Sequence, residues 1–183
     1  VTDDQKADIH LVLSEVKSLK DNESYKLSVS DNGLTISAAS ESGLFYGVQS
    51  VKQLLLNQKS ASELRLPHLT IQDQPRFHWR GLMLDVSRHF FDKQAVMKVI
   101  DLMALYKLNT FHWHLVDGIG WRMPIDRYPE LTNKGAWRKV KPGKDPWEDF
   151  EAVYNDGSID VYGGHYSKED IKEIIAYANA KHI

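Results

Sequence analysis

Residues 80–122 read RGLMLDVSRHFFDKQAVMKVIDLMALYKLNTFHWHLVDGIGWR, and two short apolar runs in this stretch enclose a helical pattern. Each run, at residues 81–86 and 110–116, ends in polar residues that the middle of a buried strand would not tolerate. Between the runs, Asp92 is a good N-cap, and apolar residues recur at helical spacing until Asn109. We therefore expect a strand, a helix and a second, parallel strand, with the chemistry in the loops that follow the strands.

The composition of the whole chain is that of a globular protein with one medium domain or two small ones. It has 183 residues, of which 42% are hydrophobic, and a formal net charge of -2. This charge balance gives no electrostatic footprint for nucleic acid or an anionic membrane, and no apolar run approaches the ~20 residues that span a bilayer. The sequence contains no cysteine, which excludes disulfides and thiolate metal sites. Small-molecule or neutral polymer ligands fit this composition best.

The part of the chain before this stretch predicts a small α+β domain with an antiparallel sheet. Asn32-Gly33 is a strong hairpin signal between two strand patterns, and Pro75 punctuates the chain before the central stretch. We place a domain boundary near Arg76, so that the two domains cover residues 1–76 and 77–183. The expected elements of the first domain are strands at residues 8–13, 25–30, 34–39 and 64–72, and a covering helix at residues 41–57.

Residues 117–166 show no clear repeat period, although their tryptophans and tyrosines argue against disorder. We expect Trp137 and Trp147 to serve packing. A capping box with Asp170 in place of Glu begins at Ser167 and predicts a final helix.

Arg88 and Asp117 are the first candidates for a functional site. Arg88 falls just past the first parallel strand and Asp117 just past the second. If the strands are adjacent, ~4.8 Å apart, both side chains can converge at the C-terminal ends of the strands. An arginine fork with a nearby carboxylate suits a polyhydroxyl ligand, since one donates to vicinal oxygens and the other accepts from a hydroxyl. The alternative is a structural ion pair that closes the loops, and spacing does not separate the two interpretations.

Further candidates lie on or beside the two strands. His112 and His114 alternate on one strand face, which fits two ligands of a barrel metallohydrolase, but internal histidines are the more common explanation and further ligands are missing. Asp85 could pair with either histidine or with Arg88. Trp121, beside the glycine turn, is either a platform for sugar stacking or part of the loop packing.

Four segments of the chain together resemble one enzyme family. RGLMLDVSRHFF at residues 80–91, KLNTFHWHLVDGIGWR at 107–122 and GGHYSKEDIKEIIAYA at 163–178 are similar to the opening of the catalytic barrel of glycoside hydrolase family 20, the β-N-acetylhexosaminidases. ESGLFYGVQSVKQLL, at residues 41–55, resembles the helix of the small α+β domain that precedes that barrel. The resemblance implies an α/β fold that begins a (β/α)8 TIM barrel, with the active site at the C-terminal ends of its strands.

The resemblance also implies roles for individual residues. Arg88 would bind outer hydroxyls of the terminal sugar, and Asp117 would help to organise the site, with Asp85, His114 and Trp121 as possible supporting residues. Many family members have Asp-Gln directly after the equivalent of Asp117, where this chain has Gly118-Ile119. Contacts made by those two side chains are therefore not expected here.

The family's catalytic pair is not found in this sequence. Members hydrolyse terminal non-reducing N-acetyl-hexosamine residues by a retaining, substrate-assisted mechanism, an exception to the two-carboxylate scheme. An adjacent Asp-Glu pair orients the acetamido group and supplies the general acid. No Asp-Glu pair follows the central stretch, so we expect it beyond Ile183, with the chain as an inactive N-terminal portion of the enzyme.

The resemblance implies a carbohydrate substrate, an N-acetyl-hexosaminide, with no cofactor or metal, and no nucleic acid or membrane partner. Family habit implies a secreted or periplasmic location. Barrel strands without their neighbours would leave an exposed edge, through which the chain could self-associate. Two alternatives remain open: a non-enzymatic sugar-binding or assembly module, and a metallohydrolase that uses His112 and His114.

Overall fold

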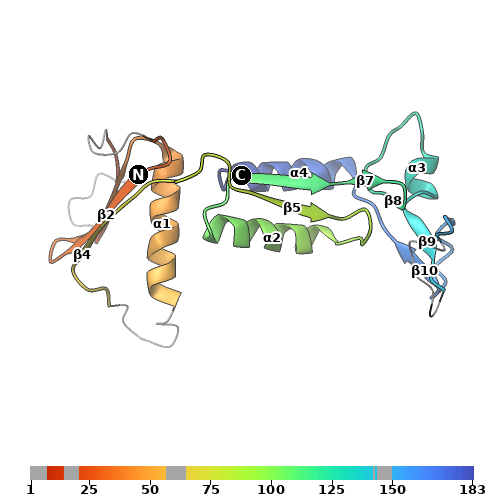
Figure 1. The fold of residues 1–183 in the computed structure, drawn as a ribbon, viewed down its shortest axis with the longest axis horizontal. Coiled ribbons are helices and arrows are strands. Elements are labelled where there is room, and N and C mark those ends of the chain that lie inside the picture. The colour runs from red at the N-terminus through yellow and green to blue at the C-terminus, as the bar shows by residue number, and fades with distance from the viewer. Residues whose placement is uncertain (1–7, 15–20, 57–64, 142, 144–149) are drawn as a thin grey trace. The chain divides into compact units, whose positions relative to one another are not determined.

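The computed structural model describes residues 8–14, 21–56, 65–141, 143 and 150–183 (Figure 1). The chain divides into two compact units. The first comprises the described residues of Val1–Arg80 together with Met103–Asn109 and His182, and the second comprises Gly81–Leu102, Thr110–Lys181 and Ile183.

The first unit is a four-stranded sheet in the order β1-β3-β2-β4, with one helix packed against it. Its elements are β1 (Ile9–Leu13), β2 (Tyr25–Ser30), β3 (Gly33–Ala38), α1 (Glu41–Leu55) and β4 (Leu69–Asp73). Alternate residues of the strands point toward the helix and form the core with it: Tyr25, Leu27, Leu34, Ile36, Ala38 and Tyr46. The predicted hairpin is confirmed, because Ser30 faces Gly33 across a two-residue turn and Gly33 has a φ of +101°.

The expectation of an antiparallel sheet was wrong for one strand. β2 runs antiparallel to both β3 and β4, but β1 pairs with β3 in parallel, so the sheet is mixed. Alternating hydrophobicity identifies a strand but not its direction. The alternation of apolar and polar residues is the same in a parallel and an antiparallel strand, so it does not predict the direction of β1.

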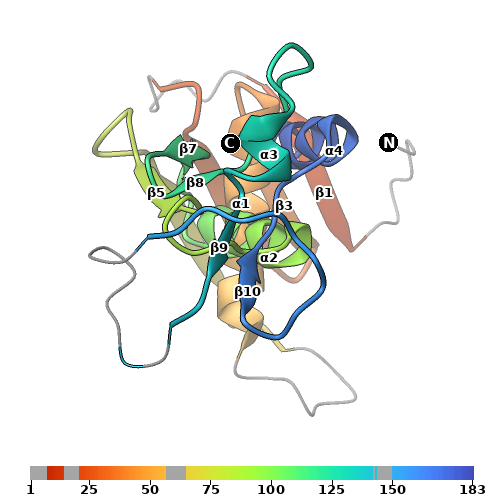
Figure 2. The same ribbon diagram turned by 90° about the vertical axis from the view of Figure 1, so that its right-hand side faces the viewer.

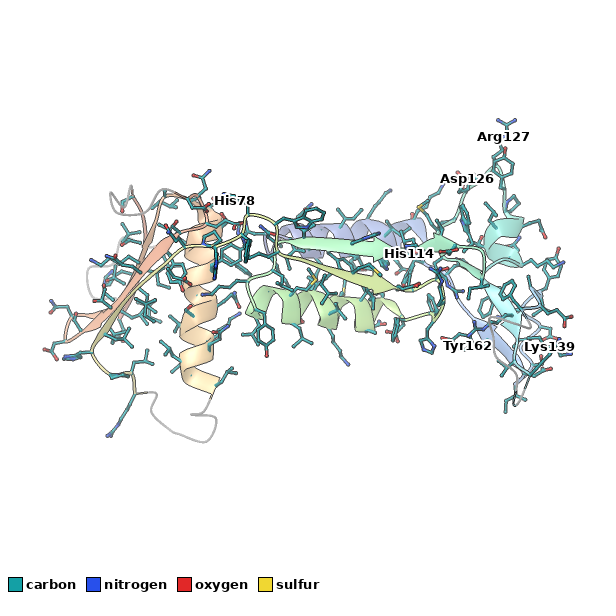
Figure 3. All side chains as sticks on the ribbon, viewed as in Figure 1. His78, His114, Asp126, Arg127, Lys139 and Tyr162 are labelled. Atoms are coloured by element: carbon teal, nitrogen blue, oxygen red, sulfur yellow. The ribbon has the colours of Figure 1, made fainter. Side chains whose placement is uncertain are left out.

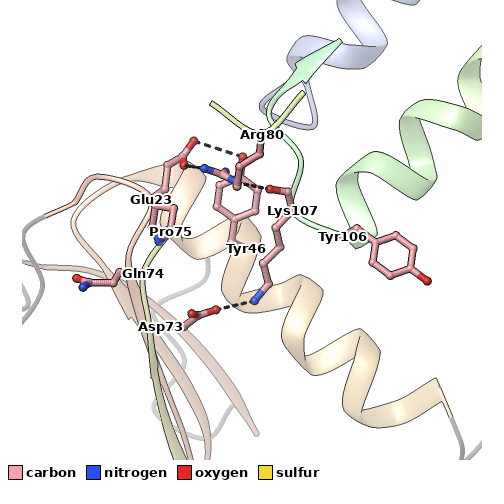
Figure 4. Close-up of a pocket in the computed structure, with 8 residues that line it drawn as sticks. All are labelled: Glu23, Tyr46, Asp73, Gln74, Pro75, Arg80, Tyr106 and Lys107. Carbon is pink, nitrogen blue, oxygen red and sulfur yellow. Dashed lines mark hydrogen bonds and ion pairs between the residues drawn. The ribbon is translucent and has the colours of Figure 1, made fainter. Parts of the chain in front are cut away.

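A polar cluster around Lys107 belongs to the first unit (Figure 4). Lys107 Nζ donates to Asp73 Oδ2, Tyr25 OH and Ser50 Oγ, each at 2.8 Å. Burial alone would lower the pKa of Lys107, but its bonds to Asp73 and Tyr25 outweigh this and raise the pKa. The cluster lies at a pocket of ≈ 200 Å³, lined by Glu23, Tyr46, Asp73, Gln74, Pro75, Arg80, Tyr106 and Lys107.

The second unit contains the predicted strand–helix–strand arrangement. Its elements are β5 (Gly81–Asp85), α2 (Lys93–Leu105, whose last three residues belong to the first unit), β6 (Thr110–His114), β7 (Val116–Asp117), β8 (Gly120–Trp121), α3 (Glu130–Asn133), β9 (Trp137–Lys139), β10 (Val161–Gly163) and α4 (Lys168–Asn179). β5 and β6 are parallel, as expected, with Asp85 opposite His114 at their ends. Apolar residues of α2 and α4 share one core with the residues around these strands: Val86, Val96, Ile100, Tyr166, Ile174 and Ala178.

The two predicted helix starts are confirmed. Asp92 Oδ1 accepts a hydrogen bond from the Ala95 backbone N–H at 2.8 Å, and Ser167 and Asp170 form a complete capping box at α4. The pKa of Asp170 is lowered to about 2, first by its contact with Lys93 and then by its bonds to Ser167.

The stretch without a sequence period folds into short pieces. β7 pairs with β8 and β9 pairs with β10, both antiparallel (Figure 2). Strands of two or three residues are too short to show a period of two, which is why the pattern did not predict them. Among the described residues, no helix has the length and apolar character needed to cross a membrane.

Candidate functional site

The loops after β5 and β6 bring Arg88 and Asp117 together. Arg88 Nη1 lies 2.6 Å from Asp117 Oδ2, so the predicted convergence of these side chains is confirmed. Both remain partly open to solvent, with 30% of the Arg88 side chain and 37% of the Asp117 side chain exposed. A ligand can therefore reach this ion pair, called here the Arg88–Asp117 pair.

Asp85 fixes the turn that carries Arg88. Its Oδ1 accepts from the backbone N–H groups of Ser87 and Arg88, at 2.9 and 3.1 Å, and its Oδ2 accepts from Arg88 Nη1 at 3.0 Å. The Asp85 carboxylate thus fixes the backbone of the turn at Ser87 and Arg88 and also orients the Arg88 guanidinium. Of the partners considered from the sequence, Asp85 pairs with Arg88.

His114, labelled in Figure 3, contacts both members of the pair. Its Nε2 is 2.9 Å from Arg88 Nη1 and 3.0 Å from Asp117 Oδ2. The ring of His112 is 6.0 Å away, centroid to centroid. Among the described residues, no group of three or more His, Cys, Asp or Glu side chains is arranged to hold a metal ion, so the metallohydrolase interpretation finds no third ligand there.

The Asp117 carboxylate is stabilised in its ionised form. Its Oδ1 accepts from the Gly118 backbone N–H at 2.7 Å. This bond contributes most to the lowered pKa of Asp117, followed by the bond to His114, and the charge of Arg88 acts in the same direction. Asp117 is therefore a hydrogen-bond acceptor over the whole physiological pH range.

Arg122, directly after β8, has a buried side chain. Only 1% of the residue is exposed, and its guanidinium donates to four backbone carbonyls. The acceptors are Val86 at 2.9 Å, Ser87 at 2.6 Å, Ala136 at 2.5 Å and Gly164 at 3.0 Å. Burial lowers the pKa of Arg122, although an arginine stays protonated in proteins.

Arg122 links the two loops of the site. Two of its acceptors directly precede Arg88, and Ser87 Oγ also donates to the carbonyl of Gly120, at 2.7 Å. Gly120 is in turn the β-sheet partner of Asp117. A side chain at Gly120 would not fit, because its Cβ would lie 2.2 Å from Ser87 O and 2.6 Å from Arg122 Nη2.

Sequence reasoning missed Arg122. It stands at the end of a turn, where an exposed arginine is equally common, and no period in the surrounding residues shows that it is buried. Its only signal is its place as the last residue of the resembling segment at residues 107–122.

The structure describes two of the three tryptophans considered from the sequence, Trp121 and Trp137. Trp121 is half-buried, and its Nε1 donates to the carbonyl of Met123 at 2.7 Å, which fixes the ring in the loop. Trp137 is half-buried in β9, and Trp147 lies outside the described residues. A stacking role for Trp121 stays a prediction.

Comparison with known protein families places this geometry in context. Residues 77–183 match the family described as Glycosyl hydrolase family 20, catalytic domain, and residues 1–74 match Glycosyl hydrolase family 20, domain 2. The chain belongs to glycosyl hydrolase family 20. The resemblance noted in the sequence is thereby confirmed.

Relatives of this family 20 chain are named as hexosaminidases or chitobiases. It is 39% identical to a beta-hexosaminidase of Vibrio furnissii over 158 residues, which cover 86% of this chain and 24% of that protein. It is 42% identical to the N,N'-diacetylchitobiase of Vibrio harveyi over 163 residues, which cover 87% of this chain and 18% of that protein. The chain therefore spans a quarter or less of the length of these relatives.

Solved family 20 structures are similar in fold as well. A Vibrio harveyi exo-β-N-acetylglucosaminidase in complex with N-acetylglucosamine matches with a TM-score of 0.79 and 37% identity, over 95% of this chain and 26% of that one. A mutant Streptomyces plicatus β-hexosaminidase in complex with its product GlcNAc matches with a TM-score of 0.78 and 36% identity, over 99% of this chain and 33% of that one. These matches confirm the α/β class and the relation to a TIM-barrel family.

Replacing Arg122 by methionine tests its structural role. Arg122→Met removes the guanidinium from four backbone carbonyls, of which that of Ala136 keeps another donor, the Gly164 N–H. We expect it to lower the free energy of unfolding by about 3 kcal/mol or more, since a hydrogen bond to a charged group contributes about 1.5–3 kcal/mol. Chemical denaturation followed by circular dichroism measures the change. Arg127→Met, the same substitution at an exposed arginine, should stay within about 0.5 kcal/mol of the unmodified chain. Equal stability of the two variants would contradict the role given to Arg122.

Proposed function

We propose that this chain carries the sugar-binding part of a β-N-acetylhexosaminidase site, which acts on terminal non-reducing N-acetyl-hexosamine residues by a retaining, substrate-assisted mechanism. The observation that supports this most is the solvent-accessible Arg88–Asp117 pair at the ends of two parallel strands in a family 20 chain. The names of the relatives, beta-hexosaminidase and N,N'-diacetylchitobiase, support the same substrate class.

The chemistry of the pair suits a sugar ring. A guanidinium donates in a fixed fork, so Arg88 can bind two neighbouring hydroxyl oxygens of a sugar. The Asp117 carboxylate accepts only, so it can bind the proton of a further hydroxyl. In this proposal Asp85 and His114 hold the pair in place, and Trp121 forms part of the wall beside it.

We also propose how the chain maps onto the domains of its family. Residues 77–183 form the first β/α units of a (β/α)8 barrel, and residues 1–76 form the small α+β domain before it, with the boundary near Arg76. The parallel arrangement of β5 and β6 around α2 supports this mapping. The position of the Arg88–Asp117 pair agrees with it, since barrel enzymes place their sites at the C-terminal ends of the strands.

The 183 residues by themselves should not hydrolyse the substrate. The sequence contains no Asp-Glu dipeptide, the arrangement that supplies the general acid in the family resemblance. We expect no turnover of a chromogenic N-acetylglucosaminide by the purified chain above the rate of a blank without protein. Clear turnover that copurifies with the chain and disappears in Arg88→Ala would contradict the expectation that these residues lack the general acid.

A second candidate function, sugar binding without catalysis, is favoured by the exposure of the pair. We expect the chain to bind N-acetylglucosamine with micromolar affinity, measured by calorimetry. Arg88→Ala should weaken binding at least tenfold, because tenfold corresponds to about 1.4 kcal/mol, near the contribution of one charge-assisted hydrogen bond. Arg127→Ala, at an exposed arginine of the same unit, serves as the control and should bind as the unmodified chain does.

An unchanged affinity in Arg88→Ala would show that the pair is a structural ion pair, the alternative left open by the sequence. Absence of binding in the unmodified chain would contradict the sugar-binding module, but it would leave the assignment to family 20 unaffected.

We further propose that the chain self-associates through the β5–β6 sheet. Within the described residues these strands pair only with each other, and Met83 on β5 is 55% exposed. Open edges and exposed apolar strand residues favour pairing between copies. Light scattering should show oligomers whose proportion falls in Met83→Lys, and a monodisperse monomer at all concentrations would contradict the proposal.

A further inference from the structure

We infer that His114 carries a hydrogen on Nε2 and acts as a positioning residue, which directs one oxygen of Asp117 to Arg88 and keeps the other oxygen available for a sugar hydroxyl. The sugar part of this inference rests on the function proposed above. The tautomer and the orientation of Asp117 do not depend on that function.

A count of hydrogens decides the tautomer. Arg88 Nη1 carries two hydrogens, and three possible acceptors lie within 3.0 Å of it: Asp85 Oδ2, Asp117 Oδ2 and His114 Nε2. If His114 Nε2 carries a hydrogen, it stops competing for the Arg88 hydrogens and becomes a donor itself, so its 2.9 Å contact with Arg88 Nη1 is no longer a hydrogen bond. Both hydrogens of Arg88 Nη1 then go to the carboxylates, and the hydrogen of His114 goes to Asp117 Oδ2 at 3.0 Å.

The opposite tautomer leaves the cluster poorly matched. With the hydrogen on Nδ1, Nε2 becomes an acceptor, and three acceptors share the two hydrogens of Arg88 Nη1. In addition, the lone pair of Nε2 would then lie 3.0 Å from the negatively charged Asp117 Oδ2. A partly buried polar cluster is costly when an acceptor goes unmatched, so the Nε2–H form is favoured.

In this arrangement the two carboxylate oxygens of Asp117 have different hydrogen-bond partners. A carboxylate oxygen has about two acceptor positions. Oδ2 uses both, for Arg88 at 2.6 Å and His114 at 3.0 Å. Oδ1 accepts from the Gly118 N–H at 2.7 Å and retains a second position, which we assign to a sugar hydroxyl.

The groups that face His114 also determine how the contact responds to pH. These are Arg88 and Asp117 from the two loops, Asp85 as its partner on β5, and His112 on its own strand. Protonation adds a hydrogen at Nδ1 and leaves the one on Nε2 in place. The bond from Nε2 to Asp117 therefore does not depend on whether Nδ1 also carries a hydrogen.

Nitrogen NMR of the 183-residue chain tests the tautomer directly. Long-range ¹H–¹⁵N spectra distinguish a protonated ring nitrogen from one with a free lone pair. At a pH where His114 is neutral, we expect Nε2 to be the protonated nitrogen. A neutral ring with its hydrogen on Nδ1 would overturn the inference, and this measurement needs neither a sugar nor a variant.

Variants test the positioning role. The amide of Gln can donate from nearly the position of Nε2, whereas Ala cannot, so His114→Gln should keep the pKa of Asp117 lowered. His114→Ala should let that pKa rise toward the ordinary value of about 3.9, as followed by carboxyl ¹³C NMR. His112→Ala, on the same strand, is the control and should leave the pKa of Asp117 unchanged. A pKa of Asp117 that is the same in His114→Ala as in the unmodified chain would overturn the role.

Sugar affinity provides a separate readout. Where the unmodified chain binds N-acetylglucosamine, His114→Ala should bind about tenfold more weakly, the equivalent of about 1.4 kcal/mol, and His114→Gln should recover most of the affinity. Where the unmodified chain binds no sugar, the proposed function fails, but the NMR results still decide the inference about His114.

Discussion

The four hydrogen bonds from the buried Arg122 guanidinium to backbone carbonyls are the constraint on which the second unit depends. A charge removed from water is costly unless hydrogen bonds replace its hydration. The carbonyl oxygens of Val86, Ser87, Ala136 and Gly164 do this, and they come from three segments far apart in the sequence. The cost of burying the guanidinium is therefore offset only when these segments bring their carbonyls together around it.

Two arginines, Arg88 and Arg122, are linked through the backbone of Ser87 and have opposite roles. Arg122 is 1% exposed and uses four of its five N–H groups on backbone carbonyls, so its role is structural and a ligand cannot reach it. Arg88 has 30% of its side chain exposed and lies against carboxylates, so it can exchange water for a ligand. Arg122 holds the carbonyls of the two residues before Arg88, which makes the position of the exposed arginine a consequence of the buried one. The planar, rigid fork of arginine suits both tasks, and a lysine would fit neither.

The strand–helix–strand unit could be predicted because its strands and helix are long enough to show their periods, and because Asp92 marks the start of the helix. The convergence of Arg88 and Asp117 followed from that unit, since residues just past neighbouring parallel strands lie close together. The parallel direction of β1 and the short pairs β7–β8 and β9–β10 could not be predicted, because direction and two-residue strands leave no periodic trace. The burial of Arg122 was hidden for a different reason: its acceptors are backbone atoms, which carry no residue identity.

A crystal structure of the 183-residue chain grown with N-acetylglucosamine tests the proposed site most directly. We expect a sugar whose hydroxyl oxygens lie within hydrogen-bond distance of the Arg88 guanidinium and of Asp117 Oδ1, with Asp117 Oδ2 still bonded to His114. A structure at saturating sugar in which the Arg88–Asp117 pair contacts only water, while the sugar lies elsewhere, would contradict the proposed site.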